Sequence, residues 1–432
     1  MFRSIFNELK KWKDDINKKP LIIQGTRQVG KTWVMKEFGK SEYEDLLYVN
    51  FERDKIVTNI FQNDLNPSDI IEALEIKFNK SIKEQNTLII FDEIQECPNA
   101  LTSLKYFCEE TKYNIMCAGS FLGIALHKNT SFPVGKVEFL NLYPLSFNEF
   151  LIANKQERLV NLLLKQDFEK IKIFKNELKK YLKLYFYIGG MPEAVQEYIN
   201  TNDLTIVRKI QERILESYVN DFSKHADKSV FSRILALWQS IPSQLSRENK
   251  KFIYKNIKEG ARSKDYEVAM QWLSDCGLIY KITKISKPYF PINSYVDNSS
   301  FKLFIVDIGL LSALCHLNSE VIINNNNIFT EFKGSLTEQF VLQELKTNRD
   351  LLIHYWGNNN GNAEVDFVIQ KNEFIIPIEV KATVNLQAKS LKVYNETFKP
   401  KMAVRTSLAD YKQTSILYDV PLYTIGNFIE KV

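Results

Sequence analysis

The chain has 432 residues, which is too many for one ordinary hydrophobic core, and two to four domains are expected. Its hydrophobic fraction of 45% and charged fraction of 25% are those of a globular protein, and a net charge of +5 does not by itself indicate nucleic-acid binding. The five cysteines form no CxxC pair and no ligand-like spacing with the four histidines, which argues against a disulfide framework and a structural zinc site. The N-terminus lacks a signal-peptide pattern, and no apolar run approaches a membrane span, so a cytoplasmic protein without membrane contact is expected.

Residues 21–32, LIIQGTRQVGKT, form a pattern of a short apolar strand, a glycine-containing loop and the start of a helix. The loop at 25–32 matches GxxxxGK[ST], in which backbone N–H groups curve around the phosphates of a nucleotide. Lys31 is expected to reach the β- and γ-phosphates of ATP, and the Thr32 hydroxyl to ligate Mg²⁺. A chance glycine turn is the alternative, which the strand before the loop and the helix after it disfavour. The residues expected to bind the nucleotide are Gly25, Arg27, Gln28, Val29, Gly30, Lys31 and Thr32.

Residues 87–93, TLIIFDE, form a buried-strand pattern that ends in two carboxylates. Asp92 is expected to hold Mg²⁺, and Glu93 to polarise the water that attacks the γ-phosphate. A solvated strand end would also carry such acids, but the loop at 25–32 favours a nucleotide site. A third strand at 113–118 precedes Ser120, which is placed to sense the γ-phosphate, although Gly-Ser is also common in turns. Alternating strands and helices predict an α/β fold whose parallel sheet holds the nucleotide at its carboxyl edge.

Four stretches of the chain together resemble the prokaryotic AAA-type ATPases. They are GTRQVGKT at 25–32, FDEIQ at 91–95, YPLSFNEFL at 143–151 and YIGGMPEAV at 187–195. The resemblance extends over essentially the whole chain and implies an ATP-hydrolysing P-loop NTPase domain over 1–150, of a type that often assembles as homo-oligomeric rings. The family often has Gly-Arg where this chain has Gly135-Lys136, and lysine lacks the planar fork of arginine. No charge-stabilising finger is therefore assigned, and Arg27 is another candidate.

Residues 151–225 are rich in Leu, Lys, Glu and Phe at helical spacing, which predicts a helical lid and connector. Residues 226–323 predict a winged-helix domain, and basic residues outnumber acidic ones over most of it. Its expected elements are helices near 231–240, 252–257 and 264–275 and wing strands at 278–282 and 288–290. Arg262, Lys264 and Gln271 are placed to face a DNA groove, where phosphate contacts would supply most of the affinity. Winged helices in such ATPases also act as packing or partner modules, and this alternative stays open.

A polar linker at 324–327 precedes a predicted C-terminal domain over 328–432. Its first element is an amphipathic helix at 332–346, which contains Glu338. Two apolar strands follow, and both carry charged residues that a buried strand would normally lack. These strands lie at 365–369 and 375–381.

The second of these strands carries Glu379 and Lys381, whose spacing of two places them on one face. A hairpin turn near 371–373 would also bring Asp366 beside Glu379. Two acids and a lysine in an apolar sheet are costly unless a cation neutralises them, and we expect this cation to be Mg²⁺.

This arrangement resembles the PD-(D/E)xK nuclease core, a restriction-endonuclease-like α/β fold. The resemblance implies that Glu338, Asp366 and Glu379 ligate Mg²⁺. It also implies that Lys381 and Glu379 serve catalysis, with Lys381 orienting or deprotonating the attacking water. Asp366 follows Val365 where the motif has a proline. The alternative is a structural Glu379–Lys381 pair in a domain that holds DNA without cleaving it.

The sequence as a whole predicts an ATP-dependent enzyme that acts on double-stranded DNA, with ATP and Mg²⁺ as cofactors. In this interpretation, nucleotide binding and hydrolysis position the winged helix and the nuclease-like domain on DNA. The alternative is a nucleotide-gated switch or scaffold whose C-terminal domain binds nucleic acid or protein without cleaving it. A third interpretation is that the C-terminal fold acts on RNA, since a basic winged helix can also bind structured RNA.

Overall fold

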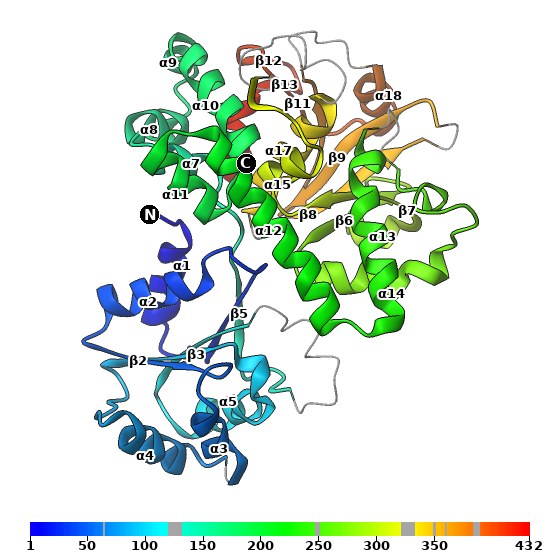
Figure 1. The fold of residues 1–432 in the computed structure, drawn as a ribbon. Helices are drawn as coiled ribbons and strands as arrows, with labels where there is room; N and C mark the ends of the chain where they lie inside the picture. Colours follow the sequence, from blue (N-terminus) through cyan, green and yellow to red (C-terminus); the bar gives the residue numbers. More distant parts are fainter. Residues whose placement is uncertain are drawn as a thin grey trace. The chain divides into compact units, whose positions relative to one another are not determined.

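The computed structural model describes residues 1–63, 65–119, 132–246, 251–320, 333–348, 351–358, 361–382 and 389–432. The chain divides into two units (Figure 1). One comprises Met1–Tyr143 with Asp275–Leu278, and the other comprises Pro144–Ser274 with Ile279–Val432. Ser120 and the predicted linker at 324–327 lie outside the described residues.

The first unit is built on a five-stranded parallel sheet with the strand order β2-β3-β4-β1-β5. Its strands are β1 Leu21–Gln24, β2 Asp45–Asn50, β3 Thr87–Asp92, β4 Asn114–Ala118 and β5 Glu138–Asn141. The alternating pattern of strands and helices predicted this sheet, because parallel neighbours need a crossover connection between them. The carboxyl ends of β1 and β3 lie at the same sheet edge, with β4 between the two strands.

Helices cover both faces of this sheet (Figure 1). They are α1 Ile5–Asp14, α2 Lys31–Glu42, α3 Lys55–Asn63, α4 Pro67–Phe78 and α5 Pro98–Glu110, with a 3₁₀ turn η1 at Ile94–Glu96. On β3, Leu88 and Ile90 share a core with α1 and α2, whereas Ile89 and Phe91 share a core with α3, α4 and α5. Since both faces of β3 are buried, the strand is an uninterrupted apolar run in the sequence.

The second unit begins with a run of helices, which confirms that residues 151–225 are helical. These helices are α7 Phe147–Ala153, α8 Glu157–Lys165, α9 Phe168–Ile173, α10 Lys175–Ile188, α11 Pro192–Thr201, α12 Leu204–His225, α13 Lys228–Leu245 and α14 Ser263–Asp275. The predicted helix at 252–257 is a single 3₁₀ turn, η2, at Tyr254–Asn256. None of the helices in the described ranges is long and apolar enough to cross a membrane.

An eight-stranded sheet of order β12-β13-β11-β10-β9-β8-β6-β7 forms the rest of this unit (Figure 1). The strands are β6 Ile279–Ile285, β7 Val296–Ile305, β8 Leu352–Gly357, β9 Glu364–Lys371, β10 Phe374–Val380, β11 Ala403–Ser407, β12 Lys412–Thr414 and β13 Leu417–Pro421. Further helices are α15 Ile308–Leu314, α17 Lys333–Lys346, α18 Lys389–Phe398 and α19 Ile425–Lys431, and the 3₁₀ turns are η3 Ile292–Tyr295 and η4 Leu422–Thr424. Because β6 pairs in parallel with β8, the β6–β7 hairpin and the C-terminal strands form one continuous sheet.

The prediction of a wing strand at 288–290 is wrong. The strand that pairs antiparallel with β6 is β7, at Val296–Ile305. Pro288 and Pro291 lack the backbone N–H that a sheet ladder needs, so the intervening segment forms a loop. The Ser286 N–H closes this loop by donating to the Tyr295 carbonyl at 2.8 Å. The interpretation of residues 226–323 as a winged helix stays a prediction.

The glycine pair in the YIGGMPEAV stretch allows close packing within the second unit. The Leu145 N–H donates to the Gly190 carbonyl at 2.7 Å, and the Gly190 N–H donates to Asp307 Oδ2 at 2.6 Å. A Cβ on Gly190 would lie 2.3 Å from the Leu145 carbonyl oxygen, so the position requires glycine. Burial raises the pKa of Asp307 to about 6, although the N–H groups of Gly190 and Leu310 oppose the shift. This motif therefore has a packing role that its sequence alone did not reveal.

Candidate nucleotide site and C-terminal carboxylate cluster

The phosphate loop, residues 25–32, connects β1 to α2 through backbone conformations that favour glycine. Gly25 has φ of 148° and Gly30 has φ of 97°, both in the region that residues with a Cβ rarely adopt. A Cβ on Gly25 would also lie 2.3 Å from the carbonyl oxygen of Leu142. Gly30 is the N-cap of α2, so the loop ends at a helix N-terminus, where free N–H groups favour a bound anion.

The Lys31 side chain folds back onto the phosphate loop. Its Nζ donates to the carbonyl oxygens of Gly25 at 2.7 Å and Thr26 at 2.9 Å. Burial lowers the pKa of Lys31 to about 8, although the negative charges of Glu93 and Asp92 oppose the shift. The ammonium is therefore held by neutral acceptors, from which it can move to a phosphate.

Asp92, the last residue of β3, receives two hydroxyl hydrogen bonds on one carboxylate oxygen. Thr32 Oγ1 and Tyr48 Oη both donate to Asp92 Oδ2 at 2.8 Å. Asn50 Nδ2 in turn donates to Tyr48 Oη at 3.3 Å. Burial raises the pKa of Tyr48 to about 12, and the carboxylate of Asp92 acts in the same direction. No sequence pattern indicated Tyr48, because its place depends on the parallel pairing of β2 with β3.

The oxygen atoms of Thr32 and Asp92 fit the magnesium site that the sequence predicts. A hydroxyl and a carboxylate from two separate elements converge within 2.8 Å of each other beside the phosphate loop. Mg²⁺ takes oxygen ligands and is commonly held by one or two carboxylates together with substrate phosphates. The Thr32 and Asp92 side chains would therefore hold Mg²⁺ against a bound triphosphate.

Glu93 follows β3 in a left-handed backbone conformation, with φ of 52° and ψ of 46°. Residues other than glycine rarely adopt this conformation, and such residues cluster at functional sites. Gln95 Nε2 donates to Glu93 Oε2 at 2.7 Å, which holds the carboxylate in one position. Gln95 lies in the FDEIQ stretch, but the sequence did not indicate this contact.

The remaining predicted nucleotide-site residues have different environments. Arg27 and Gln28 are half-buried on the loop. The side chain of Val29 is fully buried in the core, so this residue can offer only its backbone to a nucleotide. The Val29 carbonyl accepts a hydrogen bond from Arg3 Nη1 at 3.2 Å. Lys136 is paired with Glu109 at 2.8 Å on the surface, and its role as a charge-stabilising finger stays unassigned.

The predicted hairpin in the second unit is confirmed. β9 and β10 pair antiparallel with Ile378 opposite Phe367, which brings Asp366 beside Glu379. Asp366 Oδ2 accepts the N–H of Val380 at 2.8 Å. Lys381 Nζ donates to Glu379 Oε1 at 2.6 Å, so these two side chains meet on one face as predicted. Burial raises the pKa of Glu379, although the Lys381 ammonium opposes the shift.

A second lysine, which was not among the predicted site residues, lies among these acids. Lys302 Nζ is 2.6 Å from Glu364 Oε1, 3.6 Å from Glu338 Oε2 and 3.8 Å from Asp366 Oδ1. Its side chain is only 1% exposed. Burial alone would lower the pKa of Lys302, but the three carboxylates outweigh burial and raise this pKa. A lysine inside the apolar stretch FKLFI at 301–305 was the available signal.

These side chains define the carboxylate cluster, which consists of Glu338, Glu364, Asp366 and Glu379 with the ammonium groups of Lys302 and Lys381. Within the described residues, no group of three or more His, Cys, Asp or Glu side chains is arranged to hold a metal ion. In this arrangement the cluster does not fit Mg²⁺, because an ammonium already lies among the acids. The predicted metal roles of Glu338, Asp366 and Glu379 and the catalytic role of Lys381 stay predictions.

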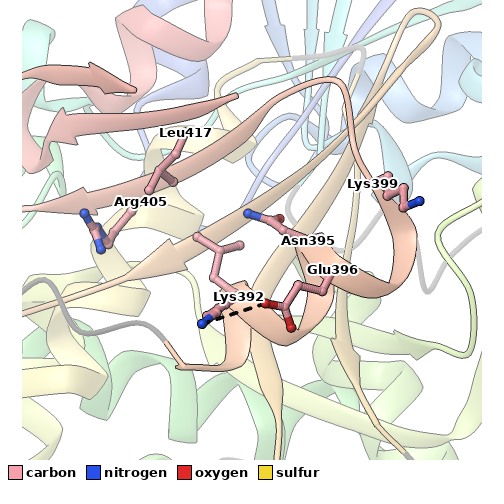
Figure 2. A pocket seen from close by; sticks show the side chains of 7 residues that line it. Lys392, Asn395, Glu396, Lys399, Arg405 and Leu417 are labelled. Carbon is pink, nitrogen blue, oxygen red and sulfur yellow. Dashed lines mark ion pairs between the residues drawn. The ribbon is translucent and has the colours of Figure 1, made fainter. Parts of the chain in front are cut away.

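A cavity of about 650 Å³ lies elsewhere in the second unit, beside α18 (Figure 2). It is lined by Leu391, Lys392, Asn395, Glu396, Lys399, Arg405 and Leu417. Arg405 lies 2.7 Å from Asp419, and Lys392 lies 3.8 Å from Glu396. Two of the three cations that line the cavity therefore already have carboxylate partners.

The family comparisons divide the chain into three segments. Residues 17–151 match a family model described as an AAA domain. This match and the five-stranded parallel sheet decide the identity of the segment. Residues 17–151 are an AAA-type P-loop ATPase domain. Proteins with this AAA-type domain bind nucleotide, usually with Mg²⁺, in agreement with the geometry of Thr32 and Asp92.

The rest of the chain matches two models that describe no activity. Residues 179–321 match a domain of unknown function, DUF8612, and residues 333–425 match another, DUF4143. No curated protein sequence matches the chain significantly. The AAA-type domain is thus the part for which a family match indicates chemistry.

Three solved structures show limited similarity. A Walker-type ATPase of Pyrococcus abyssi is 13% identical, and the match covers 73% of this chain and 96% of that protein with a TM-score of 0.46. The ORC1 protein of Aeropyrum pernix in complex with DNA is 12% identical, with coverage of 73% and 93% and a TM-score of 0.29. Cdc6p of Pyrobaculum aerophilum is 10% identical, with coverage of 73% and 91% and a TM-score of 0.24. At such scores these similarities carry no conclusion about function.

Proposed function

We propose that the AAA-type domain binds ATP with Mg²⁺ and hydrolyses it, and that hydrolysis is coupled to association of the second unit with double-stranded DNA. The convergence of Lys31, Thr32 and Asp92 at one edge of a parallel sheet carries this proposal. These residues supply an ammonium, a hydroxyl and a carboxylate, which are the groups that a magnesium triphosphate requires.

In the proposed reaction, the γ-phosphate takes the place of the loop carbonyls as the partner of Lys31. The Lys31 ammonium then neutralises phosphate charge, while backbone N–H groups of the loop orient the triphosphate. Mg²⁺, when bound, stabilises the negative charge that develops on the phosphate oxygens. Glu93 leaves Gln95 to orient the attacking water and to accept its proton.

The variant Glu93→Gln tests the assignment of the base. It should bind ATP with wild-type affinity and lose at least about 100-fold in turnover, since a general base contributes that much or more. The matched control is Glu96→Gln, which removes the same charge from an exposed residue three positions away and should leave turnover unchanged. Undiminished turnover in Glu93→Gln would overturn its role as the base.

DNA association is proposed from the two faces of α14. Tyr266, Met270 and Trp272 are buried on one side of this helix. Lys264 and Gln271 lie on its exposed surface, and Arg262 is exposed just before it begins. Basic side chains in this position can contact DNA phosphates, which would make binding weaker as salt increases.

The test of DNA association is ATP turnover and duplex binding in Arg262→Ala/Lys264→Ala. The double variant should weaken binding of a duplex oligonucleotide, flatten its salt dependence and remove any stimulation of turnover by DNA. The control Lys228→Ala/Arg233→Ala removes two exposed positive charges from α13. It therefore has the same net charge as Arg262→Ala/Lys264→Ala. Equal effects of the two double variants would indicate that net charge, and no specific surface, governs the interaction.

A nucleotide-gated switch is the second candidate function. The hydrogen bond from Gln95 holds Glu93 in one position, which favours slow hydrolysis and a long-lived ATP state. In this case ATP occupancy would change the association of the chain with itself or with a partner. A shift in molar mass on ATP addition, measured by light scattering, without DNA-stimulated turnover would support the switch.

A further inference from the structure

We infer that the ammonium group of Lys302 is the permanent counter-ion of the carboxylate cluster and takes the place of a divalent cation there. The observation behind this inference is that one buried ammonium lies within 2.6–3.8 Å of three carboxylates, two from β9 and one from α17. The inference is independent of ATP hydrolysis, which concerns the other unit.

Lys302 is fixed in this position by its backbone. It lies in β7, where it is paired with Ile282 of β6. Three residues later, Ile305 donates to Gln339 Oε1 at 3.1 Å and accepts from Gln339 Nε2 at 2.7 Å, which ties the strand to α17. Since the side chain is only 1% exposed, its ammonium cannot move to solvent without disturbing the sheet.

The charges of the cluster are divided between the two lysines. Lys381 forms an ion pair with Glu379, whereas Lys302 forms ion pairs with Glu338, Glu364 and Asp366. Without Lys302, three carboxylates would be left close together in a partly buried site, where like charges repel more strongly than in water. The cluster therefore requires a cation, and the chain supplies one covalently.

A divalent cation would compete with this ammonium for the same oxygens. Mg²⁺ needs carboxylate oxygens at about 2.0–2.1 Å, and Lys302 Nζ already lies between Glu338 and Asp366 within reach of both. An ion bound there would lie against a fixed positive charge. Glu379 Oε2 is buried and has no hydrogen-bond partner within the described ranges, so a cation could use this oxygen once Lys302 is removed.

The test measures Mn²⁺ binding to nucleotide-free protein by the electron paramagnetic resonance signal of free Mn²⁺. Asp92→Asn is present in every sample to remove the phosphate-loop site. With Lys302 intact, the protein should bind Mn²⁺ only at millimolar concentration. Lys302→Met should bind at least ten-fold more tightly, and adding Asp366→Asn should abolish this gain.

The matched control is Lys381→Met, which removes the same charge from the same cluster and should produce a much smaller gain. Tight micromolar binding by the protein with Lys302 intact, if abolished by Asp366→Asn, would overturn the inference. So would a folded Lys302→Met protein that binds Mn²⁺ no better than the protein with Lys302. If Lys302→Met is unstable, Mn²⁺ should raise its thermal midpoint, and failure to do so would also contradict the inference.

Discussion

The phosphate loop and the carboxylate cluster each contain a buried lysine close to carboxylates, but they hold it in opposite ways. Lys31 donates to two neutral carbonyl oxygens, and burial lowers its pKa to about 8. Lys302 is surrounded by three carboxylates, and their charge outweighs burial and raises its pKa. Both lysines are buried. The charged form of Lys31 is destabilised by burial, whereas the charged form of Lys302 is stabilised by neighbouring carboxylates.

This difference relates the environment of a lysine to what the lysine can do. An ammonium held by carbonyl groups gains a much stronger partner when a phosphate arrives, so Lys31 is suited to ligand binding. An ammonium already neutralised by carboxylates gains little from any further anion, and its removal exposes unpaired acids. Lys302 is thus suited to holding a site together.

The largest expected effect is the loss of stability in Lys302→Met. One buried and two partly buried carboxylates lose the buried ammonium that they share, and breaking a buried ion pair costs about 3–5 kcal/mol. Urea unfolding should show this loss near pH 7 and a partial recovery as the pH falls, because protonation of the acids then favours the folded state. Lys381→Met should cost less, since the Lys381 side chain is 30% exposed and the Lys302 side chain only 1%. Equal losses would contradict the special role of Lys302.

The second effect concerns Lys31→Ala, which should weaken ATP binding by about 100-fold. A hydrogen bond to a charged group is worth about 1.5–3 kcal/mol, and the variant removes the ammonium that contacts the phosphates. Isothermal titration calorimetry with a slowly hydrolysed ATP analogue would measure the change. Lys40→Ala, which removes a charge from the exposed surface of α2, should bind as the wild type does. Unchanged affinity in Lys31→Ala would contradict the assignment of the phosphate loop.

The third effect is a difference between Lys31 and Lys302 in how their contributions to folding stability depend on pH. The folded pKa of Lys31 is about 8, below its usual value of 10.5. Between these two pH values the folded state binds fewer protons than the unfolded state, so the stability of the wild type rises with pH. Between pH 7 and 10, nucleotide-free wild type should gain about 2 kcal/mol relative to Lys31→Met in urea unfolding. The raised pKa of Lys302 predicts no such gain relative to Lys302→Met. A pH-independent difference for Lys31→Met would show that this lysine is not destabilised by burial.

The smallest effect is expected for Gln95→Ala. This variant removes the hydrogen bond that holds Glu93 and should raise basal ATP turnover a few-fold, because water can replace the amide donor and offsets most of the about 1.5–3 kcal/mol of a hydrogen bond to a charged group. ATP affinity should not change, because Gln95 is not expected to contact the phosphates. A fall in steady-state turnover would instead mean that Gln95 places Glu93 productively.

The sequence by itself determined the elements whose causes are local. Glycines at 25 and 30 and the flanking apolar run specified a strand, a loop and a helix, because only glycine tolerates those backbone angles. The hairpin of β9 and β10 followed from two apolar strands joined by a short turn at Asn372, which is left-handed with φ of 51°. The false wing strand at 288–290 shows the limit of such patterns where prolines remove the N–H groups that pairing needs.

Only the tertiary structure decided which distant residues share a site. Tyr48 reaches Asp92 because β2 and β3 lie in parallel register, and no local pattern encodes that register. Lys302 reaches Asp366 because the β6–β7 hairpin joins the C-terminal sheet and α17 covers it. The physical reason is that the free energy of a buried charge depends on its three-dimensional neighbours, which the sequence order does not specify.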